Sequence, residues 1–140
     1  MTELARAKEA LLRGGYTCAI CKGETLYTSD ERGVKPLLSW LNSGAALANA
    51  AAADKVVGKA AAFLYVLLGV REVYAPVISE RARSVLEEHA IALEAEIVVP
   101  AIRNRRGDGY CPMESAVWDI EDAREAKAAI EKKAKELAGK

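Results

Sequence analysis

The sequence predicts an α/β fold with three layers, in which a mixed sheet is flanked by helices. Helical and strand-like segments alternate through the middle of the chain with short links, as in a parallel crossover sheet. Near the N-terminus, two strand-like segments separated by Lys22-Gly23 indicate an antiparallel hairpin. The length of 140 residues suits a single domain, residues 1–140.

Composition excludes several classes of function. Twenty basic and twenty acidic side chains give zero net charge, which argues against a general nucleic-acid binder. The apolar run Ala60–Val70 is too short to span a bilayer, so no membrane segment is expected. Three cysteines, and an N-terminus without an apolar signal core, suggest reduced thiols in a cytoplasmic protein.

Element boundaries follow from caps, turns and apolar spacing. In the first half, the expected elements are a helix over 3–13, strands over 16–21 and 24–28, a charged loop over 29–35 and a helix from Pro36 to 41. Residues 45–53 are alanine-rich, which favours a helix, but Asn49 and the fresh start at Asp54 favour a buried strand. We expect the strand.

The second half begins with a helix over 54–69 that is apolar on every side of its body, as in a helix buried at the centre of a domain. The expected elements that follow are a strand over 72–78, a helix capped by Ser79 with Ala82, Val85, Leu86 and His89 inward, a strand over 93–99, a loop over 101–110, and helices over 111–118 and 122–138.

Two candidate motifs have ordinary structural explanations. Cys18 and Cys21 have C-x-x-C spacing, but in a strand they point to opposite faces, so two core thiols are expected. The single histidine, His89, lies in the last turn of a helix, where an edge-of-core or capping role is expected.

Charge at the start of the central helix is a stronger indication of function. Asp54, Lys55 and Lys59 precede a buried body, and buried charge is costly unless it is paired or used. The alternative is an aspartate cap followed by two lysines that extend to solvent.

A second candidate is the loop that enters the helix at Cys111. Arg103, Arg105 and Arg106 are suited to phosphate or carboxylate, and the helix start favours an anion. The alternatives are a solvated loop and a capping box made by Cys111 and Glu114. Ligands of parallel sheets collect at helix starts, here 29–36, 54 and 111. The ligand-binding residues predicted on this basis are Lys35, Asp54, Lys55, Lys59, Arg103, Asn104, Asp108, Tyr110, Cys111 and Glu114.

Four segments carry a family resemblance, Ser29–Pro36, Ala53–Ala62, Val73–Ser79 and Gly109–Val117. Together they resemble a small prokaryotic family of proteins of unknown function, over roughly residues 5–137. That family is placed in the cytidine deaminase-like superfamily, and the resemblance implies its fold, a mixed sheet between helices. True zinc deaminases bring two helix starts to the metal, one with His-x-Glu and one with Pro-Cys-x-x-Cys.

By helix order, the resemblance places Asp54, Lys55 and Val56 at the first motif, and Cys111 to Glu114 at the second. Valine cannot transfer a proton, so ordinary deamination is not expected. Two carboxylates and one thiolate are an unusual zinc set, so neither zinc nor another cofactor is expected.

Three hypotheses follow. The first is a cytoplasmic deaminase-like protein that binds a small anionic ligand such as a nucleotide. The second is an enzyme with other chemistry, in which Cys111 is a nucleophile or Asp54, Cys111 and Glu114 hold a metal. The third is an interaction module that docks a partner or a second copy through the charged helix over 122–138.

Overall fold

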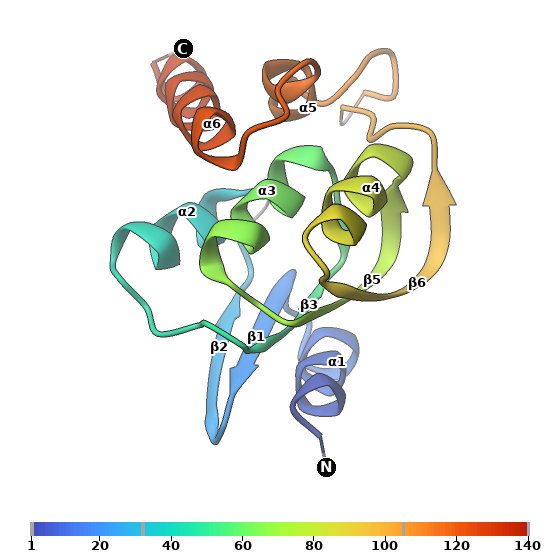
Figure 1. Cartoon of the computed structure of the whole chain (residues 1–140). Coiled ribbons are helices and arrows are strands. Elements are labelled where there is room, and N and C mark those ends of the chain that lie inside the picture. The colour runs from blue at the N-terminus through green and yellow to red at the C-terminus, as the bar shows by residue number, and fades with distance from the viewer. Residues whose placement is uncertain (1, 32, 105, 140) are drawn as a thin grey trace.

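A computed structural model describes residues 2–31, 33–104 and 106–139. These residues form six strands and six helices (Figure 1). In chain order they are α1 (Glu3–Arg13), β1 (Cys18–Lys22), β2 (Thr25–Ser29), α2 (Lys35–Asn42), β3 (Ala51–Asp54), β4 (Val56–Val57), α3 (Lys59–Leu68), β5 (Glu72–Ser79), α4 (Glu80–Glu88), β6 (Ala92–Val99), α5 (Pro112–Val117) and α6 (Ala123–Ala138).

The strands form one mixed sheet, which confirms the predicted class. β1 pairs antiparallel with β2 and with β3, and β5 pairs in parallel with β3, β4 and β6. β3 and β4 lie one after the other along the same side of β5, because Ala51–Ala53 pair with its start and Val56–Val57 with its end. The chain bends at Lys55 between these two short strands.

Helices cover both faces of the sheet (Figure 1). α1 packs its buried Ala7 and Leu11 against one face, in a cluster with Ala19, Ala53 and Tyr74. α2, α3 and α4 contribute to the larger core on the opposite face, and α5 and α6 pack on α3 from outside. α3 is therefore enclosed between the sheet and an outer pair of helices, and its Phe63, Leu64 and Tyr65 are fully buried.

Three sequence-based expectations need correction. α3 begins at Lys59, with Gly58 as its cap, because Asp54 ends β3 and the next residues pair with β5 as β4. Within residues 45–53, only those from Ala51 onward form a strand. His89 caps the C-terminal end of α4 but is exposed and not inward.

The strand predicted over 93–99 is present as β6, although it lies at an edge of the sheet. Its neighbour is β5 alone among the described strands, and Ile97 is 57% exposed. Over the described residues, no helix is both long enough and apolar enough to cross a membrane.

The enclosed position of α3 makes its core side chains sensitive to truncation. We expect Leu64→Ala to lower the free energy of unfolding by about 2–5 kcal/mol, because it leaves a cavity against the sheet. Urea denaturation measures this. Leu12→Ala is the matched control, since Leu12 is 60% exposed on α1, and it should change stability by less than about 0.5 kcal/mol. Equal effects of the two substitutions would contradict the packing described.

Candidate functional site

A cavity of about 850 Å³ opens beside the starts of α2, α3 and α5. Its size is in the range of small-molecule sites. The side chains that line it come from β1, the start of α2, the turn between β3 and α3, residues 102–114 and the end of α6: Thr17, Cys18, Gly33, Val34, Lys35, Leu38, Asp54, Lys55, Val56, Gly58, Ala60, Ala61, Ile102, Arg103, Asn104, Arg106, Cys111, Pro112, Met113, Glu114, Ala134, Leu137 and Ala138. Three chain segments predicted to converge, around residues 35, 54 and 111, do meet here.

The carboxylate of Glu114 occupies the start of α3. Its Oε1 accepts the N–H of Lys59 at 2.7 Å and its Oε2 accepts that of Ala60 at 3.1 Å. These are two of the N–H groups that a helix start leaves without an intrahelical partner. Glu114 is only 3% exposed, and burial raises its pKa, although the two N–H donors act in the opposite direction. The start of α3 thus binds a carboxyl group of the protein itself, whereas the helix start expected to favour an anion was the one at Cys111.

Gly58 makes room for this carboxylate. A Cβ at position 58 would lie 2.4 Å from Glu114 Cδ, whereas the backbone of Gly58 (φ −99°, ψ 179°) is ordinary extended chain. Glycine is therefore required by the close approach of Glu114 and not by backbone conformation. The capping box considered as an alternative for Cys111 and Glu114 does not form, since Cys111 makes no side-chain cap bond and Glu114 turns to α3.

Asp54 is the buried acid of the cavity lining. It is 8% exposed and accepts the hydroxyl of Tyr65 on Oδ2 at 2.8 Å, while Cys18 Sγ lies 3.3 Å from the same hydroxyl. Burial raises the pKa of Asp54 to about 7, because the hydrogen bonds from Tyr65 and the Val56 backbone offset only part of the desolvation. Asp54 can therefore either donate or accept a proton near neutral pH.

The two cysteines of the C-x-x-C spacing face opposite sides of the sheet, as predicted. Cys18 belongs to the core under α3 and lines the cavity, whereas Cys21 packs in the cluster under α1. Burial raises the pKa of Cys18, and the neighbouring Asp54 raises it further. Cys18 is therefore a neutral thiol of the cavity floor.

Lys59 does not have the ligand-binding position expected from the sequence. It is 3% exposed, and its Nζ donates to the Trp118 carbonyl at 3.0 Å and lies 3.4 Å from Glu121 Oε1. Its ammonium also lies 5.7 Å from the ring centre of Phe63. The side chain links α3 to the end of α5, so its positive charge is satisfied by groups of the protein itself.

Four other basic residues that were expected near the ligand lie at the cavity. Lys35, Lys55, Arg103 and Arg106 line the cavity and are exposed. Arg105, the third arginine of the predicted cluster, lies outside the described residues. The mouth of the cavity is consequently positive while its floor carries Asp54.

Residues 102–104 and 106–111 form a narrow hairpin beside the cavity, with Arg103 and Tyr110 bridged across it. Asn104 donates to Asp108 at 2.9 Å and accepts the N–H of Gly107 at 2.8 Å, so both polar side chains shape the turn. Asn104 reaches the cavity, but Asp108 and Tyr110 do not line it. Tyr110 instead stacks on Trp118 at 5.0 Å.

The proposed metal set of Asp54, Cys111 and Glu114 is not assembled. All three line the cavity. However, both carboxyl oxygens of Glu114 accept hydrogen bonds from the start of α3, and Asp54 accepts a hydrogen bond from Tyr65. Across residues 2–31, 33–104 and 106–139, no group of three His, Cys, Asp or Glu side chains is placed to hold a metal ion.

A family model described as "TM1506: Domain of unknown function (DUF1893)" matches residues 6–134. The chain belongs to the DUF1893 family. The crystal structure of a DUF1893 family protein (TM1506) from Thermotoga maritima is similar, with a TM-score of 0.85 at 23% identity, over 95% of this chain and 91% of that chain. That similarity shows a shared fold. A comparison with curated proteins gives no match.

The family match confirms the predicted kinship with a family of unknown function. Several cavity residues of this DUF1893 chain were not predicted: Thr17, Cys18, Gly58, and Ala134, Leu137 and Ala138 of α6. Nor was Tyr65, which donates a hydrogen bond to Asp54 but does not line the cavity. One signal was present for Gly58, a glycine just before a strongly apolar helix. The end of α6 gave no such signal, because its position depends on packing against α3.

Burial of Asp54 predicts a dependence of stability on pH. Its ordinary pKa is 3.8 and its folded pKa is about 7, so the folded state binds more protons between these values. The free energy of unfolding should therefore be highest below pH 4 and should fall as the pH rises to about 7. The fall that Asp54 causes is on the order of 1–4 kcal/mol. Denaturant titrations between pH 4.5 and 8 would measure the slope.

Asp54→Asn keeps an acceptor for Tyr65 but cannot ionise, so most of the slope should disappear. A smaller slope of the same sign should remain from Glu114, whose pKa burial also raises. Asp30→Asn, at an exposed position, is the control and should keep the wild-type slope. An unchanged slope in Asp54→Asn would show that this carboxyl is not the titrating group.

Proposed function

We propose that the chain is a cytoplasmic, deaminase-like protein without zinc chemistry that binds a small anionic ligand, such as a nucleotide, in the 850 Å³ cavity. One observation carries this proposal. Four exposed basic side chains surround the mouth of a cavity whose walls are largely apolar. Such a combination suits a ligand with a flat or apolar body and an anionic end.

The lining suggests how the ligand is divided between wall and mouth. Val34, Leu38 and Met113 offer apolar surface. Ala60 and Ala61 have small side chains, so the first turn of α3 takes up little of the cavity. The ligand body lies between these walls and meets the carboxyl of Asp54 on the floor. The anionic end lies near Lys35 and Lys55, where the anion and the lysine ammonium groups all stay partly hydrated.

The deaminase-like assignment is supported by the mixed sheet between helices, as the resemblance implies. Deaminase chemistry is not. α3 begins with Lys59, Ala60 and Ala61, which offer no free acid or metal ligand, and the nearby carboxylate of Glu114 is bonded to the helix start. Cysteines Cys18, Cys21 and Cys111 are free thiols, which supports the cytoplasmic assignment.

The test is a titration with the four nucleoside 5′-monophosphates and, as matched probes, the corresponding nucleosides without phosphate. At least one monophosphate should raise the melting temperature and bind by calorimetry, and its nucleoside should bind at least about tenfold more weakly. Lys35→Gln and Lys55→Gln should each weaken the monophosphate by about three- to tenfold, and added salt should do the same.

Lys22→Gln is the matched control. Cys18 and Lys22 are the first and last residues of β1, and Lys22 does not line the cavity. It should leave the affinity unchanged. Absence of binding by every monophosphate, or equal weakening by Lys22→Gln, would contradict the proposal.

A further inference from the structure

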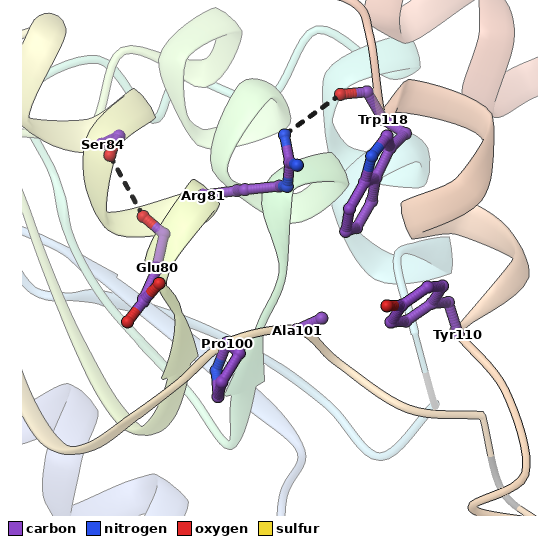
Figure 2. A pocket seen from close by; sticks show the side chains of 7 residues that line it. All are labelled: Glu80, Arg81, Ser84, Pro100, Ala101, Tyr110 and Trp118. Atoms are coloured by element: carbon purple, nitrogen blue, oxygen red, sulfur yellow. Dashed lines mark hydrogen bonds between the residues drawn. The ribbon is translucent and has the colours of Figure 1, made fainter.

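The outer side of the edge strand β6 is open. Figure 1 shows β6 at the rim of the sheet, paired along its inner side with β5. After Val99 the chain does not return along the rim, because it passes Pro100 and Ala101 and continues toward Tyr110 (Figure 2). An edge strand of this kind presents N–H and C=O groups that can pair with a further strand.

The backbone of Val98 faces this open side. The N–H of Val77 in β5 donates to the Lys55 carbonyl at 3.3 Å, so the peptide groups of Val77 face β4. Those of the next residue, Ile78, therefore face β6, where a parallel ladder joins them to the residues on either side of its register partner, Val98. The N–H and C=O of Val98 itself consequently point outward.

The side chain of Val98 carries the core out to the same edge. Val57, Ile78 and Val98 are register partners across β4, β5 and β6, so their side chains form one row on one face of the sheet. Val57 and Ile78 are fully buried in the larger core, whereas Val98 is 40% exposed. Ile97, which lies on the opposite face in register with Val77, is 57% exposed. An aliphatic strand placed alongside would cover side chains on both faces.

The glutamates of β6 restrict how a second copy of the strand can fit. Two copies can pair antiparallel about a two-fold axis, with one residue opposite itself. An axis within residues 94–96 would place a glutamate opposite a glutamate, which is destabilising. An axis at Val98 avoids this, places Ile97 opposite Val99 of the second copy, and lets the two Val98 residues exchange N–H···O=C bonds. The zero net charge of the chain adds no general repulsion between copies.

We propose that the chain forms a homodimer in which two copies of β6 pair antiparallel about Val98 and join the two sheets into one. Aliphatic residues then meet aliphatic residues along the end of the strand, which makes this edge complementary to itself. The surface differs from the charged α6, where docking was expected. It is also separate from the function proposed above, because Ile97, Val98 and Val99 do not line the larger cavity.

Sedimentation of the whole chain between about 1 and 200 μM tests the dimer, whose short ladder predicts a Kd of about 1–100 μM. Val98→Lys places two ammonium groups opposite each other and should weaken the dimer at least about tenfold. Leu26→Lys is the matched control, because Leu26 is a 44% exposed aliphatic residue of β2, at the other end of the sheet. It should leave the Kd unchanged.

A cross-link tests the register without adding charge. In a Cys111→Ser background, Val98→Cys should form a disulfide between copies on mild oxidation, since opposed residues of an antiparallel pair have Cα atoms about 5.5 Å apart. Cys18 and Cys21 are buried, and Leu26→Cys is the control that should not cross-link. The proposal is overturned if the wild type stays monomeric up to about 200 μM. It is also overturned if Leu26→Lys dissociates the dimer as Val98→Lys does, or if the two introduced thiols cross-link equally.

Discussion

The carboxylate of Glu114 on the first N–H groups of α3 is the interaction on which the rest of the structure depends. It joins two segments that are 55 residues apart in sequence, and both of its oxygens are used. Truncation of such a buried acceptor leaves donors unsatisfied, at a cost of about 1–3 kcal/mol. Because Glu114 lies in α5, this contact also fixes α5 over the buried helix α3.

Lys59 strengthens the same junction from the other side, since its ammonium donates to the carbonyl of Trp118 at the end of α5. Arg81 of α4 contacts the same carbonyl and covers the Trp118 ring. α5 is thus held by α3 and α4 together, and the hairpin that leads into it is positioned by the stack of Tyr110 on Trp118.

The sequence could predict what depends on local pattern. The opposite orientation of Cys18 and Cys21 follows from the two-residue period of a strand, and the burial of α3 follows from its apolar body. The start of α3 could not be predicted, because aspartate is a common helix-capping residue. Only pairing with strands that are distant in sequence places Asp54 in β3 and Val56–Val57 in β4. The partner of the helix start was equally hidden, since Glu114 is far away along the chain.

A double-mutant cycle on Gly58 and Glu114 tests this junction most directly. Gly58→Ala places a Cβ 2.4 Å from the Glu114 carboxyl carbon, so it should destabilise the otherwise wild-type chain by more than the loss of a glycine cap alone. In the Glu114→Ala background the same substitution meets no carboxylate. Urea denaturation should therefore give a coupling energy of about 1 kcal/mol or more. Additive effects of the two substitutions would contradict the placement of Glu114 at the start of α3.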